Sequence, residues 1–113
     1  MRYLIVTECN VGQGRMQEFT TEVQKWEQDA MNSEHAPELH AVYLRSEDPS
    51  RVLIVTQFPS REEAEGFESH LTEFKNLVLA PVTDEPVMNG FDLFYAATPQ
   101  GAEVVFGEDV GHE

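Results

Sequence analysis

The sequence has 113 residues, the length of a single domain with one hydrophobic core. Hydrophobic residues make up 41% of it and charged residues 25%, a balance typical of folded globular proteins and not of disordered ones. The formal net charge is −14, because 21 acidic residues outnumber 7 basic ones. This acidity argues against nucleic acid and anionic membrane surfaces as partners, since both are bound mainly through Lys and Arg.

The acidic excess lies mostly in the second half of the chain. Residues 1–57 contain five basic and nine acidic side chains, whereas residues 58–113 contain two basic and twelve acidic ones. The two basic residues are Arg61 and Lys75. The acidic surface either meets a cationic partner or keeps the protein in solution, and we favour the second interpretation because runs of charge usually face water.

Cys9 is the only cysteine, so the sequence predicts no internal disulfide. No His or cation is placed beside it by spacing, so we expect a small buried residue and not a nucleophile. The apolar run near the N-terminus is too short for a signal peptide, and no segment approaches the roughly 20 apolar residues that span a bilayer. We therefore expect a cytoplasmic protein.

The histidines stand far apart and have no second cysteine beside them, so we expect no metal site. They are His35, His40, His70 and His112. The glycines of residues 12–14 lack the third glycine and the lysine of a phosphate-binding loop, and we expect no cofactor.

Alternating side chains predict the first strand, and a period of three to four residues predicts the first helix. The strand covers residues 3–11, is apolar on both faces at its start, and ends at the glycines of residues 12–14. The helix covers residues 15–33 and ends before Pro37. Its apolar stripe consists of Met16, Phe19, Val23, Trp26 and Ala30.

Two further strands and a second helix follow. The strands cover residues 38–45 and 51–58, and the turn-forming residues 46–50 join them as an antiparallel hairpin. Ser60 and Glu63 have the spacing of a capping box, in which each side chain bonds the backbone of the other residue. The helix that this box starts has a second apolar stripe, made of Ala64, Phe67, Leu71, Phe74 and Val78.

A loop at residues 80–90, with two prolines and a glycine, precedes a last strand at residues 91–97. The remaining residues 98–113 form an acidic tail. Its apolar run at residues 104–106 is either a short edge strand exchanged with a partner subunit or part of a loosely tethered end. We therefore expect one domain over residues 1–97 and a separate tail.

The order strand, helix, strand, strand, helix, strand predicts an α+β, ferredoxin-like βαββαβ fold with both helices on one face of an antiparallel sheet. Yet residues 4–6, 52–55 and 93–95 carry large apolar groups on both strand faces. Because two helices cover only one face, we expect a second copy of the chain to cover the other, in a dimeric α+β barrel.

The sequence resembles the antibiotic biosynthesis monooxygenase-like proteins of the dimeric α+β barrel superfamily over most of residues 3–97. The resemblance rests on GQGRMQEF (residues 12–19), on VLIVTQF (52–58) followed by PSREEA (59–64), and on FESHLTEFK (67–75), whose histidine is His70. It implies a homodimer with one pocket per subunit, between the sheet and the two helices.

The same resemblance argues against one branch of the superfamily. The haem-degrading members use an Asn on the first strand and a Trp and a His on the second helix. The glycine register places Thr7, Phe67 and Leu77 near these positions. None of the three has the required side chain, so we do not expect haem degradation.

Oxygenation of a phenol without a cofactor needs an apolar slot and a few polar groups that hold a phenolate. We predict His70, Thr7 and Asn10 as catalytic residues, with His40 and Gln57 as further polar candidates. Each has a structural alternative, and the residues on helical stripes are favoured first as core. The predicted substrate-binding residues are Trp26, Tyr43, Phe67, Phe74 and Tyr95.

The sequence thus favours a monooxygenase that acts on a small aromatic or quinol-like compound. One alternative is a non-catalytic dimeric barrel that binds a small ligand or serves in a stress response. Another is a purely structural protein whose side chains fill the pocket. A cavity between the helices and the sheet would support the first two interpretations over the third.

Overall fold

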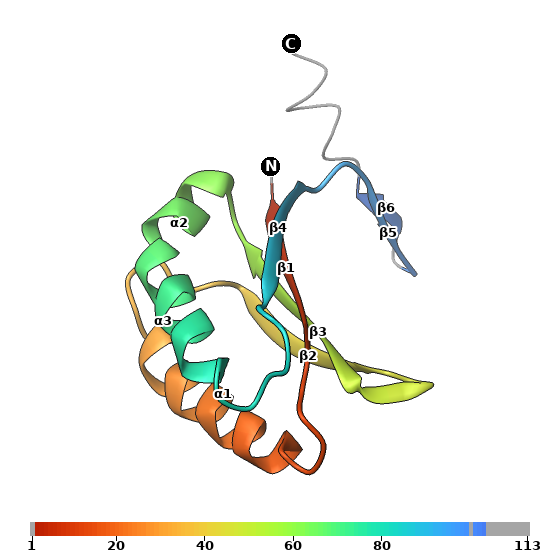
Figure 1. Ribbon diagram of the computed structural model, residues 1–113. Coiled ribbons are helices and arrows are strands. Elements are labelled where there is room, and N and C mark those ends of the chain that lie inside the picture. Colours follow the sequence, from red (N-terminus) through yellow and green to blue (C-terminus); the bar gives the residue numbers. More distant parts are fainter. Residues whose placement is uncertain (1, 100, 104–113) are drawn as a thin grey trace.

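The computed structural model describes residues 2–99 and 101–103, and in it four strands form one antiparallel sheet with the order β2-β3-β1-β4. The helices of the described residues, α1 to α3, lie on one side of this sheet (Figure 1). The strands are β1 (Tyr3–Asn10), β2 (Leu39–Arg45), β3 (Asp48–Phe58) and β4 (Val87–Asp92), and the helices are α1 (Met16–Ala30), α2 (Arg61–Gly66) and α3 (Glu68–Val78). This arrangement confirms the predicted α+β, ferredoxin-like fold.

The core lies between the sheet and the helices. Alternate residues of β1 and β3 point into it, so that Ile5, Thr7 and Cys9 of β1 are buried together with Val52 and Ile54 of β3. The side chains between them point to the opposite face, which no helix covers in the described part of the chain. We call this opposite surface the open face.

The first helix carries its predicted stripe into the core: Phe19, Val23, Trp26 and Ala30 are all buried. It ends at Ala30 and not at residue 33 as predicted. The reason lies in its last carbonyl groups, which accept hydrogen bonds from the side chains of Asn32 and Ser33. Such side-chain bonds end a helix before the proline is reached.

The second predicted helix is two helices in the structure, joined at Phe67. The Ser60 hydroxyl accepts a hydrogen bond from the Glu63 backbone N–H, as a capping box requires. The other half of the box is absent, because the Glu63 carboxylate bonds the His35 ring at 2.8 Å instead. Phe67 is fully buried at the joint, with its ring 5.3 Å from that of Phe58.

The hairpin of β2 and β3 is tighter than predicted, since the turn covers only residues 46 and 47 and β3 begins at Asp48. The residues read as turn formers instead make an irregularity within the strand, where the register shifts between Leu44 and Arg45. Asp48 accepts hydrogen bonds from the backbone and the hydroxyl of Ser50, which explains this local departure from the ladder.

The last predicted strand, at residues 91–97, is wrong in position. β4 begins at Val87 and ends at Asp92, and a separate hairpin of β5 (Ala96–Thr98) and β6 (Gly101–Glu103) follows it. Figure 1 shows this hairpin standing away from the sheet. Gly90, read from the sequence as part of a loop, lies inside β4 opposite Ile5. The predicted edge strand at residues 104–106 lies outside the described residues.

Candidate functional site

A groove runs between the helices and the edge of the sheet formed by β1 and β4. It consists of two adjoining hollows of about 290 and 230 Å³, which share Tyr3, Ile5, Glu68 and Leu71. We call it the helix–sheet groove. Its remaining lining residues are Arg61, Ala64, Glu65, Thr72, Lys75, Met88, Asn89 and Gly90.

The groove has an apolar floor and a charged rim. Ile5, Leu71 and Met88 provide aliphatic surface, and acidic side chains of α2 and α3 stand beside them. Arg61 and Lys75, the two basic residues of the second half of the sequence, also line it. Their ion pairs, with Glu65 and Glu85 at 3.6 Å, are exposed, and such pairs exchange readily for a ligand because they contribute little energy.

Tyr3 lies where the two hollows meet. The Arg61 guanidinium sits over its ring, 5.9 Å from the centroid. On its other side the phenol reaches over Gly90: a Cβ at that position would collide with the Tyr3 Oη and Cζ atoms. The missing side chain in β4 is therefore what makes room for the ring.

Four of the predicted residues come together in the core under the helices. Trp26, Phe67 and Phe74 are 0–2% exposed, and the Trp26 ring packs edge to face against both phenylalanine rings, at 5.8 and 5.0 Å. The Trp26 indole N–H donates to the His70 carbonyl at 2.7 Å, and the His70 ring packs on Phe67 at 5.0 Å. These contacts fill the space that the three large rings were expected to line.

A further histidine joins this aromatic cluster. The His40 ring lies 5.0 Å from that of Trp26, and its Nδ1 atom is 3.0 Å from a carboxylate oxygen of Glu27. Only 2% of the His40 side chain is exposed. The pair therefore ties β2 to α1 from within the core.

Thr7 and Asn10 lie apart from this cluster. Thr7 is buried on the helix side of β1 and is the register partner of Met88, which lines the groove. Asn10 ends β1, and its backbone N–H and carbonyl hold the loop before β4 through Asp84 and Thr83.

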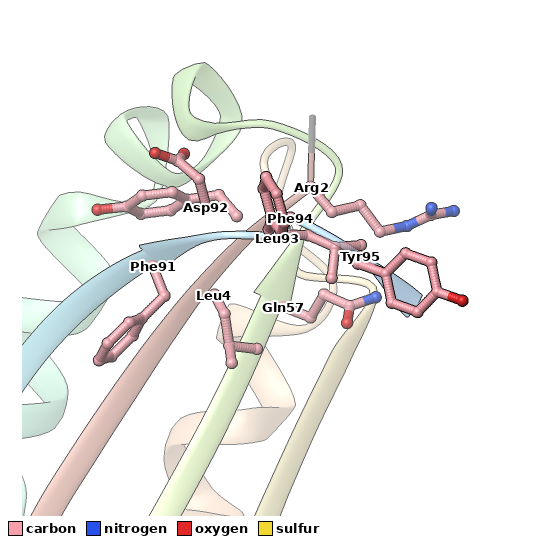
Figure 2. Close-up of a pocket in the computed structure, with 9 residues that line it drawn as sticks. Arg2, Leu4, Gln57, Phe91, Asp92, Leu93, Phe94 and Tyr95 are labelled. Atoms are coloured by element: carbon pink, nitrogen blue, oxygen red, sulfur yellow. The ribbon is translucent and has the colours of Figure 1, made fainter. Parts of the chain in front are cut away.

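Tyr43 and Tyr95 are both exposed and lie away from the helix layer. Tyr43 belongs to the open face of β2, and Tyr95 follows β4. Tyr95 lines a separate hollow of about 260 Å³ with Gln57 and Arg2 at the end of the open face. Figure 2 shows Leu4 and Phe91 projecting into this hollow from neighbouring strands. The eight predicted site residues therefore do not form one site.

Cys9 is buried and forms no disulfide. This environment is that of a core residue, whereas a nucleophilic cysteine is partly exposed. Burial, and to a smaller extent the nearby Asp84 carboxylate, raise the pKa of the Cys9 thiol to about 11, against an opposing effect of Arg51. Within residues 2–99 and 101–103, no group of three or more His, Cys, Asp or Glu side chains could hold a metal ion. In the same described ranges no helix is long and apolar enough to cross a membrane.

The residues that line the groove are not recognisable from the sequence pattern. Tyr3, Glu68 and Lys75 have the spacing of ordinary strand and helix-surface positions. The signal that could have pointed to Tyr3 is Gly90. A glycine inside a strand indicates that another group approaches the backbone closely.

No family model and no curated protein matches the sequence. Solved structures do match, among them a conserved protein from Methanosarcina mazei Go1, with a TM-score of 0.71 and 16% identity over 80% of this chain and 91% of that one. Two are named "putative antibiotic biosynthesis monooxygenase", from Nitrosomonas europaea and Bordetella bronchiseptica, with TM-scores of 0.70 and 0.68. They are 12% and 17% identical, and the matches cover 83% and 81% of this chain and 91% and 96% of theirs.

The sheet order, the helix layer and the groove between them define an α+β protein of the ferredoxin-like class. Within that class the chain has the fold of the antibiotic biosynthesis monooxygenase-like proteins, which is the family its sequence resembles.

Proposed function

We propose that the protein is a cofactor-independent monooxygenase that oxidises a small aromatic or quinol-like compound in the helix–sheet groove. The observation that carries this proposal is the groove itself, a hollow with an aliphatic floor and a polar rim between sheet and helices. The names of the structural neighbours point to the same class of reaction.

The groove supplies what such chemistry needs. An aromatic ring packs against Ile5, Leu71 and Met88, and the cations of Arg61 and Lys75 favour the deprotonated form of a phenol. The phenolate then gives one electron to dioxygen, and the resulting phenoxyl radical and superoxide combine at a ring carbon that carries a hydrogen. Cleavage of the O–O bond with loss of water leaves a quinone, so the substrate supplies all four electrons that reduce dioxygen to the quinone oxygen and water. None of the predicted catalytic residues Thr7, His70 and Asn10 lines the groove, so this proposal gives the holding of the phenolate to Arg61 and Lys75.

Oxygen uptake with a panel of hydroquinones tests the proposal. Leu71→Trp fills the groove and should lower the rate about ten- to hundred-fold, because displaced substrates react poorly. Leu79→Trp is the matched control, since Leu79 follows the same helix and is exposed. Equal rates in both variants, or no uptake by the wild-type protein with any hydroquinone, would contradict the proposal.

A non-catalytic binding protein is the second candidate function. It is favoured by the distribution of the predicted catalytic residues, since Asn10 holds a loop through its backbone and His70 packs on Phe67. In that case the hydroquinones bind to the wild-type protein and not to Leu71→Trp, and no oxygen is consumed.

We also propose that a second copy of the chain covers the open face. Five large apolar side chains on this face are 37–55% exposed, more than an isolated sheet in water favours. They are Leu39, Tyr43, Leu53, Val87 and Phe91. A second copy brings an identical apolar surface, so one self-complementary contact buries both.

A further inference from the structure

The Tyr3 side chain is held in one position at the centre of the groove. Its backbone is paired on both sides, with Phe58 of β3 and Asp92 of β4. Its ring lies across Gly90 on the sheet and under the Arg61 guanidinium. A side chain fixed in this way presents its hydroxyl at a defined place.

The Tyr3 hydroxyl has no hydrogen-bond partner among residues 2–99 and 101–103, although it sits beside the polar groups of the rim. No buried side-chain oxygen or nitrogen in these residues lacks a partner, so the hydroxyl is open to the groove. A hydroxyl in this situation both donates and accepts, and it is available to a bound molecule.

We propose that Tyr3 is the specificity residue of the groove and selects aromatic ligands that carry a hydroxyl group. This inference rests on the proposed function, since it takes the groove as the binding site. The ring of the ligand lies on the apolar floor next to Leu71, and its oxygen meets the Tyr3 hydroxyl over Gly90. An ether of the same shape cannot donate a hydrogen bond and binds less well.

The Tyr3→Phe variant tests this proposal with a matched pair of probes, 2-naphthol and 2-methoxynaphthalene. The two differ only by a methyl group on the oxygen, and the variant keeps the ring that packs on Gly90. Titration calorimetry should give the wild-type protein a preference of about three- to ten-fold for 2-naphthol. Tyr3→Phe should lose that preference by binding 2-naphthol more weakly, with 2-methoxynaphthalene unchanged.

A preference that survives in Tyr3→Phe would overturn the assignment and leave groove binding intact. If Leu71→Trp binds both probes as well as the wild-type protein does, the groove is not the site and both proposals fail. A Gly90→Ala variant adds an independent measurement, because its new methyl group must displace the ring. We expect it to remove the preference as Tyr3→Phe does, and retention of the preference in this variant would also overturn the assignment.

Discussion

At the scale of single residues, the structure separates groups that are chemically available from groups that are not. Cys9 is a thiol sealed in the core, and the Tyr3 hydroxyl is a polar atom open to a groove. Sequence spacing predicted the first correctly, because a lone cysteine without a neighbouring cation is usually core. It could not predict the second, because only the pairing of β1 with β4 places Tyr3 over Gly90.

The raised pKa of Cys9 predicts a loss of stability in alkaline solution. Between pH 9.0 and about 11 the unfolded chain releases the thiol proton while the folded chain keeps it, so the free energy of unfolding falls across this range. We expect a loss of up to about 3 kcal/mol, measured by urea denaturation. The Cys9→Ala variant should lack this part of the loss, and an identical pH dependence in both proteins would contradict the prediction.

At the scale of elements, a hydrogen bond between His35 and Glu63 links the loop after α1 to the first turn of α2. The His35 ring lies over Gly66, where a Cβ would come within 2.7 Å of it, and bonds the Glu63 carboxylate. The hydrogen bond to Glu63 is the main cause that raises the pKa of His35. Gly66, in the last turn of α2, has no side chain, and this lets the His35 ring pack against the helix. The sequence pattern indicates only a loop at His35 and a helix start near Glu63, and not the contact between them.

This contact predicts a pH-dependent contribution to stability. Because the pKa of His35 is raised in the folded state, the stabilisation is complete below its ordinary value of 6.5 and is lost as the pH rises through the folded-state pKa. Glu63→Gln should therefore lower the melting temperature at about pH 5.5 more than at about pH 8.5. Glu62→Gln, in the same helical turn, is the control and should show no such difference. Equal behaviour of the two variants would refute the prediction.

The helices and strands also show which structural features a sequence pattern is enough to predict. The stripe of α1 predicted its buried residues correctly, because a helix against a sheet buries one face whatever the rest of the fold does. The limits of β3 and β4 were wrong because Pro49 and Gly90 are turn formers by local preference. In the folded protein Pro49 lies in the irregular first part of β3, and Gly90 lies in β4 under the Tyr3 ring. Contacts between elements distant in the sequence, and not local preference, therefore set the limits of these two strands.

At the scale of the whole molecule, charge and apolar surface oppose each other. The chain carries −14, yet its open face exposes Tyr43, Val87 and Phe91 by more than half. A dimer formed through this face doubles the net charge, so burial of apolar area drives association against repulsion between like charges.

Salt should therefore strengthen the proposed dimer. Analytical ultracentrifugation at about 0.02 M and about 0.5 M salt should show tighter association at the higher concentration, because the screening length shortens from ~20 Å to ~4 Å. Leu53→Glu places a charge on the open face and should give monomers. Leu79→Glu adds the same charge at an exposed position after α3 and should remain dimeric. A wild-type monomer at both salt concentrations would rule out the dimer.

The strand order has a consequence for synthesis on the ribosome. β1 is made first, yet it lies in the interior of the sheet, between β3 and β4. Its second neighbour is complete only when Asp92 of the 113 residues has been added. Until then a nascent chain carries one unpaired edge of an apolar strand, a surface on which other unfinished chains can add. Folding of this protein therefore depends on β4, the last strand of the four-stranded sheet, to protect β1, the first.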